Sequence, residues 1–247
     1  MKKLLVLTIG IFTLGQILAQ DLSLDEIVTK FLDATGQEKF MKVQTVKMTA
    51  KTSQQGSMDF QISILAKQPR KMRQEIEVQG LSIVMVVDGE KGWTINPMTG
   101  SNDPQDLPQE AITELMKEGR LEPSVSWDNP LVNWKESGIK IDLVGQEDVD
   151  GASAYHLRAT YEDGQVVNYF LDSSTFYILK SKSRTLVQGQ EMDAEVQCTD
   201  FMGIDGIIMP KKITMLFNGQ ILQVMTIDTI EFNVPVDDSI FEKPVAK

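Results

Sequence analysis

The sequence predicts a mainly β (α+β) fold: a curled antiparallel half-barrel of about ten or eleven strands with an N-terminal helix and a helical cover segment. Three observations support this prediction. Apolar residues alternate with polar ones over most of the chain, Asp-Gly and Asn-Gly pairs separate the alternating runs, and residues 97–138 interrupt them with a different composition. A sheet of this size must curl because its strands twist.

The first twenty residues have the pattern of a secretory signal peptide. A positive start, Lys2-Lys3, precedes an apolar run from Leu4 to Leu18, and Ala19 followed by Gln20 suits cleavage near Gln20. No cysteine lies near that position to carry a lipid anchor. We therefore expect residues 1–20 to be removed and residues 21–247 to form a single soluble domain in the periplasm.

The composition limits the partners of the mature chain. The formal charge is -11, and loss of Lys2 and Lys3 with the signal makes it -13, which disfavours binding to nucleic acid. Cys198 is the single cysteine, so no intrachain disulfide can form. Stability must come from the packing of about 225 residues, which is enough for one large β domain.

An amphipathic helix opens the domain. Ser23 and Glu26 form a capping box, in which each side chain accepts a hydrogen bond from the other residue's backbone. Apolar residues then recur at helical spacing until Gly36, which is typical of a helix end: Ile27, Val28, Phe31 and Leu32.

After this helix the apolar period changes to two, which is typical of half-buried antiparallel strands. The first two predicted strands place one set of residues on the inner face: Met58, Phe60, Ile62, Ile64, Met72, Ile76 and Val78. The run Leu81–Val87 is apolar on both faces, so we expect it to be covered on both sides. Later strands are predicted over 154–161, 166–171, 177–186, 194–200, 207–217 and 221–232.

Five dipeptides between these runs have the composition of tight hairpin turns, because Gly, Asp and Asn tolerate the positive φ that such turns require. The topology is therefore predicted to be a series of hairpins. The pairs are Asp88-Gly89, Asp150-Gly151, Asp163-Gly164, Asp205-Gly206 and Asn218-Gly219.

Residues 97–138 are predicted to form a cover over the sheet. The segment is rich in Pro, Asn and Asp and contains one helix, predicted over 106–119, with Asp106 and Gln109 as its capping box. An apolar stripe along this helix faces the sheet: Ala111, Ile112, Leu115 and Met116. Trp127 and Trp134 add large apolar side chains.

A search for catalytic residues finds little. His156 is the single histidine and is interpreted as a surface or cavity-rim side chain, and Cys198 lies beside acids that disfavour its thiolate. One His and one Cys exclude structural zinc, and neither a Gly-x-Ser-x-Gly turn nor a phosphate loop follows a strand. We predict no enzyme activity, no metal and no cofactor, although carboxylates paired in space are invisible to sequence.

Methionine is frequent, with 13 residues, and several of these fall on the inner face of the predicted sheet. A flexible thioether can repack around a variable apolar guest, whereas the alternative is ordinary gap filling in a core. The predicted ligand-binding set contains the inner-face residues already named and eight more: Leu81, Ile83, Met85, Trp93, Ile112, Leu115, Met116 and Met225.

Two groups of residues resemble the LolA/LolB-like lipoprotein-sorting family and its larger relatives. The first runs from Lys67 to Glu75, continues from Val86 to Trp93 and includes Pro97. The second comprises Asp200-Phe201, Ile204–Ile207, Met209-Pro210, Asn233–Asp238, Phe241 and Pro244. The resemblance covers residues 24–244, although the insertion at 97–138 is longer than in the sorting carriers.

The resemblance implies a half-open barrel whose apolar cavity takes acyl chains, in a protein of the periplasm. An arginine on an early strand then contacts the helical lid, and both Arg70 and Arg73 are candidates. We expect a monomeric carrier or binding protein for lipids or lipoprotein acyl chains, with an envelope membrane protein as a further partner. The alternative is an envelope stress sensor or adaptor that binds a partner protein.

Overall fold

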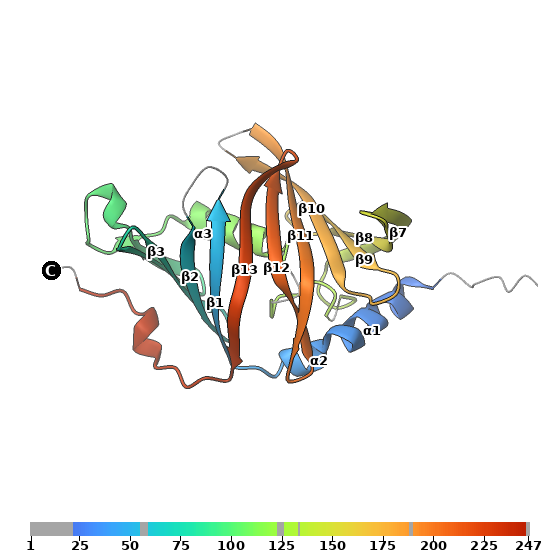
Figure 1. Cartoon of the computed structure of the whole chain (residues 1–247), viewed down its shortest axis with the longest axis horizontal. Coiled ribbons are helices and arrows are strands. Elements are labelled where there is room, and N and C mark those ends of the chain that lie inside the picture. The colour runs from blue at the N-terminus through green and yellow to red at the C-terminus, as the bar shows by residue number, and fades with distance from the viewer. Residues whose placement is uncertain (1–21, 55–58, 123–125, 133, 188–189, 246–247) are drawn as a thin grey trace, which may run out of the picture.

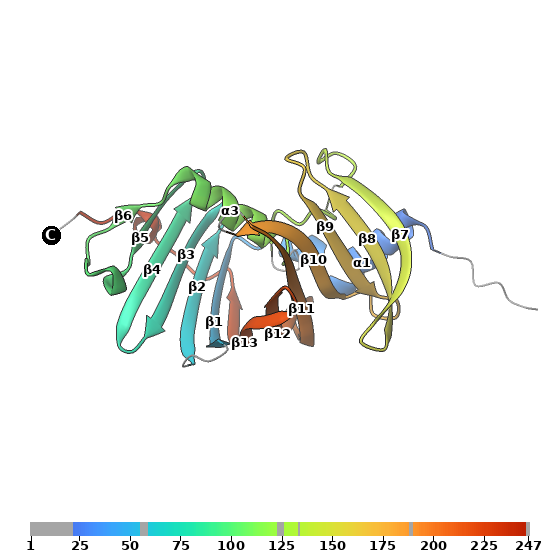
Figure 2. The same cartoon turned by 90° about the horizontal axis from the view of Figure 1, so that it is seen from above.

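In the computed structural model, residues 22–54, 59–122, 126–132, 134–187 and 190–245 are described. All the strands in these ranges belong to one antiparallel sheet, ordered β6-β5-β4-β3-β2-β1-β13-β12-β11-β10-β9-β8-β7. Figure 2 shows that this sheet curls into an open trough with one wing of β1–β6 and another of β7–β10. The predicted signal peptide lies outside the described residues, and within them no helix is long and apolar enough to cross a bilayer.

The first wing follows the helices at the N-terminus. The first part of the chain contains α1 Leu24–Thr35, α2 Gln37–Phe40, β1 Thr45–Gln54, β2 Phe60–Lys67, β3 Lys71–Val78, β4 Leu81–Asp88, β5 Lys91–Ile95, η1 Pro97–Thr99 and β6 Gln105–Asp106. The rest of the chain contains α3 Gln109–Gly119, β7 Lys140–Val149, β8 Ala152–Thr160, β9 Val166–Asp172, β10 Ile178–Val187, β11 Gln190–Ile204, β12 Ile207–Phe217, β13 Gln220–Phe232 and η3 Asp238–Phe241.

The fold class is confirmed, although the 13 strands exceed the ten or eleven expected. Strand β1 was not identified because Ala50 and Thr52 occupy buried positions on its inner face, so its alternation is not one of large apolar residues. Strand β6 has two residues and is too short to produce a periodic pattern. The first and last long strands, β1 and β13, pair side by side in the middle of the sheet (Figure 1).

Three of the five predicted turns are two-residue hairpin turns with both central residues at positive φ: Asp150-Gly151, Asp205-Gly206 and Asn218-Gly219. In the turn between β4 and β5 the central residues are Gly89 and Glu90, because Asp88 still pairs with Lys91. Asp163-Gly164 lies in a longer loop between β8 and β9. Gln79-Gly80 forms a further tight turn between β3 and β4 that was not predicted.

Helix α1 confirms the predicted capping box, with Ser23 as N-cap and Glu26 as the reciprocal partner. Its buried residues Ile27, Val28 and Phe31 join the main core, which also contains inner-face residues from both wings. Gly36 ends the helix in the left-handed conformation and lies directly against the backbone of Gly206 in the β11–β12 turn. The position of α1 on the sheet therefore depends on the close approach of these two glycines.

The other face of strand β4 is covered by the segment that follows β13. Val84, Val86 and Trp93 form a small core with Phe241 of η3, and the Trp93 indole Nε1 donates a hydrogen bond of 2.9 Å to the Phe241 carbonyl. Figure 1 shows this segment below strands β2 and β3 and α3 on their upper side. The expectation that Leu81–Val87 is covered on both faces is confirmed for its second half, where Val84, Val86 and Val87 are buried, but not for Leu81, which is 42% exposed.

Replacement of Gly36 by Ala is expected to reduce the free energy of unfolding by about 2–4 kcal/mol, because a β-carbon there meets the Gly206 carbonyl oxygen. Gly219→Ala is the matched control: Gly219 also has positive φ, but open space surrounds it, so a loss of about 1 kcal/mol is expected. Urea denaturation measures both values, and equal losses would contradict the steric argument.

Replacement of Phe241 by Ala is expected to cost about 3–5 kcal/mol, because the ring is fully packed between Val86 and Trp93. Val245→Ala, four residues on and 91% exposed, should change stability by less than about 0.5 kcal/mol. The same denaturation experiment tests both variants. A small effect of Phe241→Ala would show that the segment after β13 adds little to the sheet.

Candidate functional site

Two neighbouring open cavities lie between the trough and α3 on the inner face of the sheet. The central cavity, of about 360 Å³, lies between α3 and strands β2, β3 and β10–β13. The end cavity, of about 270 Å³, lies between α3 and the ends of β2, β3 and β4. Most of the side chains that line the end cavity are apolar, and Glu122 lines both cavities. Figure 2 shows α3 lying across the trough between the two wings.

Helix α3 presents its apolar stripe to the end cavity. Ile112, Leu115 and Met116 all line it, but Ile112 is 1% exposed whereas Met116 is 40% exposed. The helix begins at Gln109, with Pro108 as N-cap and no side-chain cap, so the predicted start and capping box at Asp106 are wrong. The reason is tertiary: Asp106 belongs to β6, where it pairs with Trp93.

The structure brings about half of the predicted ligand-binding residues to the two cavities. Ile62, Ile64 and Met225 line the central cavity, and Met72, Ile112, Leu115 and Met116 line the end cavity. Cross-strand pairing places a second group on the same face of the sheet but outside the cavity walls: Phe60, Ile76, Val78, Leu81, Ile83 and Met85. Met58 lies outside the described residues.

Trp93 does not lie on the inner face and is a correction to the predicted set. Its partner in the ladder is Val86, and both side chains point to the face that Phe241 covers. Because β4 is apolar on both faces, its sequence did not indicate to which face the Trp93 side chain on the neighbouring strand β5 points.

The two candidate arginines lie on opposite faces. Arg70 lines the end cavity, and its guanidinium Nε is 3.4 Å from an Asp128 carboxylate oxygen in the loop after α3. Arg73 instead donates to the Ile240 carbonyl at 3.0 Å and lies over the ring of Trp93. Arg70 is thus the arginine that contacts the cover segment, through its loop and not through α3 itself.

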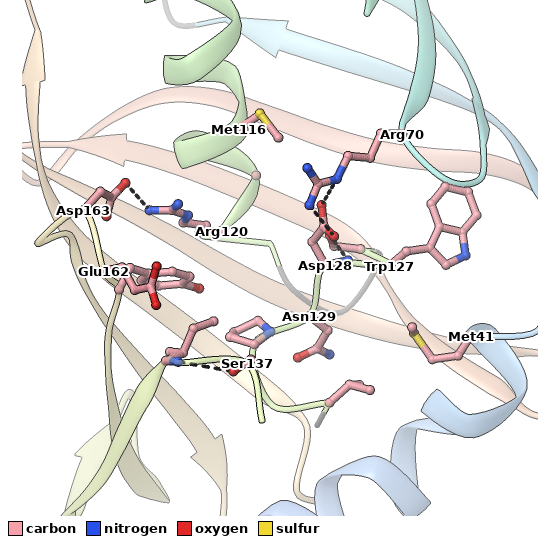
Figure 3. Close-up of a pocket in the computed structure, with 16 residues that line it drawn as sticks. Met41, Arg70, Met116, Arg120, Trp127, Asp128, Asn129, Ser137, Glu162 and Asp163 are labelled. Atoms are coloured by element: carbon pink, nitrogen blue, oxygen red, sulfur yellow. Dashed lines mark hydrogen bonds and ion pairs between the residues drawn. The ribbon is translucent and has the colours of Figure 1, made fainter. Parts of the chain in front are cut away.

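A third and more polar cavity, of about 720 Å³, adjoins the end cavity and shares Arg70, Met116, Trp127 and Asp128 with it. Figure 3 shows two ion pairs on its walls, Arg70 with Asp128 and Arg120 with Asp163. The Arg120 guanidinium also stacks over the Tyr161 ring. Sequence reasoning missed Arg120, Asp128 and Asp163 because they lie in loops and meet only in the folded chain.

Glu122 is the unusual charged group of the inner cavities. The described residues provide no hydrogen-bond or ion-pair partner for its carboxyl group, and burial, with a contribution from Glu118, raises its pKa to about 7. Burial, reinforced by Glu122, also raises the pKa of Cys198 on β11. A thiol held neutral in this way is a poor nucleophile, which agrees with the interpretation of Cys198 as inert.

His156 has a structural role that was not predicted. It is buried, its two ring nitrogens lie 2.6 Å from Glu147 and 2.8 Å from Asn168, and the ring stacks on Phe170. The interpretation as a surface or cavity-rim residue is therefore wrong. Among the described residues, no Ser, Thr or Cys side chain forms a hydrogen bond with this ring, and no cluster of three potential metal ligands is found.

The trough, its helical cover and the apolar cavities define the class of half-barrel proteins with a covered inner face. No family model and no curated protein matches the sequence. Among solved structures, a LolA superfamily protein from Nitrosomonas europaea aligns with a TM-score of 0.56 and 18% identity, over 90% of this chain and 99% of that one. The fold is therefore LolA-like, as the sequence resemblance implied.

Two further structures support the same fold. A DUF1329 family protein from Desulfovibrio piger aligns with a TM-score of 0.56 and 13% identity, over 87% of this chain and 97% of that one. A putative outer membrane lipoprotein-sorting protein domain from Vibrio parahaemolyticus aligns with a TM-score of 0.52 and 9% identity, over the same shares of the two chains.

The raised pKa of Glu122 predicts a specific pH dependence of stability. The folded chain holds this proton with a pKa of about 7 and the unfolded chain with the ordinary 4.5, so folding is favoured at low pH and the advantage is lost as pH rises from 4.5 through 7. The loss amounts to about 3 kcal/mol at most. Urea denaturation of wild type and Glu122→Gln between pH 4.5 and 8.5 should show this difference, and parallel pH profiles would contradict it.

Proposed function

We propose that this protein binds or carries lipids or the acyl chains of lipoproteins in the central and end cavities. The observation that carries the proposal is the pair of adjoining cavities between α3 and the inner face, with mostly apolar walls and volumes of about 360 and 270 Å³. The LolA-like fold supports it as an analogy. The predicted signal peptide adds a periplasmic location and a single mature domain to the same proposal.

The energetics suit a ligand that is bound and later released. An acyl chain with about 14 methylenes gains roughly 11 kcal/mol on leaving water, at about 0.8 kcal/mol for each methylene. Association costs of about 4–15 kcal/mol offset most of this gain. The net affinity is then moderate, as a carrier requires.

The cover is attached unevenly to the rest of the chain. The end of α3 is fixed by the ion pair of Arg120 with Asp163 at 2.8 Å and by the Tyr169 hydroxyl, which donates to the Arg120 carbonyl at 2.8 Å. The contact between the loop after α3 and the β2–β3 turn is weaker, which favours entry and exit there. The Arg70–Asp128 pair joins two groups whose side chains are both more than half exposed, and such pairs contribute at most about 1 kcal/mol. Ile112 is the one residue of α3 that is fully buried. In this proposal the ligand enters beside Asp128, where the loop after α3 meets the β2–β3 turn, and no catalytic step is involved.

The direct test is purification under native conditions followed by extraction and mass spectrometry of bound lipid. Co-purified lipid, or displacement of an apolar fluorescent probe by acyl chains, is the expected result. A lipid-free protein that also fails to bind the probe would overturn the proposal. Retention of an envelope protein by the delipidated chain would instead favour the adaptor function.

Filling the central cavity should block binding without unfolding the chain. Ile64→Trp places a large ring in that cavity, and the affinity for a 14-carbon acyl probe is expected to fall at least about tenfold. Leu65→Trp is the matched control, because Leu65 is the next residue on β2 and lines a separate cavity of about 540 Å³ on the opposite face. Equal affinities of the two variants would place the ligand elsewhere.

A further inference from the structure

The charged side chains that line the two inner cavities form ion pairs, except for two glutamates near the end of α3. In the end cavity Lys71 lies 3.1 Å from Asp88, and Arg70 pairs with Asp128. In the central cavity the charged side chains of the walls are also matched, Lys117 with Glu114 at 3.2 Å and Glu195 with Lys182 at 2.8 Å. Glu118 and Glu122 have no such partner among the described residues.

Glu122 occupies the point where the two cavities meet. It follows α3 by three residues, lines both cavities and is close enough to the sheet to affect Cys198 on β11. A carboxylate among apolar walls is costly unless a donor or a cation meets it. Among the described residues no side chain pairs with this carboxyl group, which leaves it available to a group of the ligand.

The sign of the charge selects the class of ligand. A fatty-acid anion or a phosphate monoester would add a further negative charge beside Glu118 and Glu122, whereas an ammonium group would neutralise one. An ammonium group also has several hydrogens to donate, and Gln74, Ser183 and Gln223 line the same cavity with oxygen acceptors.

We propose that the ligand of these cavities is an alkyl or acyl amphiphile that carries an ammonium group, and that this group pairs with Glu122. The inference rests on the proposed function, because it names the ligand class for the same cavities. The hydrocarbon chain lies along the apolar walls of the end cavity, and the ammonium group lies where the two cavities join.

The test compares three ligands with the same 12-carbon chain, dodecylamine, dodecanol and dodecanoate, in competition with a neutral apolar fluorescent probe at pH 8. At this pH the Glu122 carboxyl group is mostly ionised. Dodecylamine is expected to bind at least about tenfold more tightly than dodecanol, with dodecanoate weakest. Lauroyl lysophosphatidylethanolamine is measured beside them: affinity equal to that of dodecylamine supports a zwitterionic lipid, and weaker binding supports a simple amine.

Two variants separate a direct contact from the general negative field of the protein. Glu122→Gln keeps the shape and removes the charge, so it should lower dodecylamine affinity to that of dodecanol and leave dodecanol within about twofold. Glu110→Gln is the matched control, because Glu110 is exposed on α3, lines neither cavity and carries the same charge as Glu122. It should leave both affinities unchanged.

The outcomes distinguish this inference from the proposed function. Dodecanol binding without a preference for dodecylamine, or equal effects of Glu122→Gln and Glu110→Gln, overturns the inference alone. Failure of all the amphiphiles to displace the probe overturns the proposed function with it. Circular dichroism verifies that each variant folds, and the ranking of ligands on wild type decides the matter if Glu122→Gln does not fold.

Discussion

The continuous ladder of 13 strands is the constraint on which the rest of the structure depends. Twist makes so long a sheet curl, and a curled sheet has an inner face that its own side chains cannot fill. Helices α1 and α3 cover this face from different parts of the sequence, α1 by packing into the main core and α3 by bridging the trough. The space left under α3 forms the two cavities, so the candidate site is a product of incomplete coverage.

The sequence was sufficient for features that depend on neighbouring residues. The Ser23–Glu26 capping box, the glycine stop at Gly36 and three hairpin turns are local arrangements, and all were predictable. The inner-face alternation of Ile62, Ile64 and Met72 was readable for the same reason. Prediction failed where the structure depends on contacts with a distant segment. The Trp93 side chain faces Phe241, 148 residues away, and Asp106, which was predicted as a helix cap, pairs with Trp93 in β6.

The site itself was only partly predictable. Apolar wall residues follow from strand periodicity, but the polar groups Glu122, Asp128 and Arg120 lie in the turn and loop after α3, where no period exists. Their roles depend on tertiary contacts. Asp128 pairs with Arg70, and Arg120 pairs with Asp163, which lies 43 residues away in the sequence. Glu122 is notable because the described residues offer it no partner. Such pairings are fixed by the curl of the sheet and not by spacing along the chain.

The pairing of β1 with β13 has a consequence for biosynthesis. Strands β1–β6 and strands β7–β13 each lie side by side in chain order, but the seam between these two runs joins the first long strand to the last. Until residue 232 has been made, β1 remains an unprotected edge, open to pairing with another chain. A chaperone that shields this edge would therefore matter most for chains that stop short of β13, and such products are expected to aggregate.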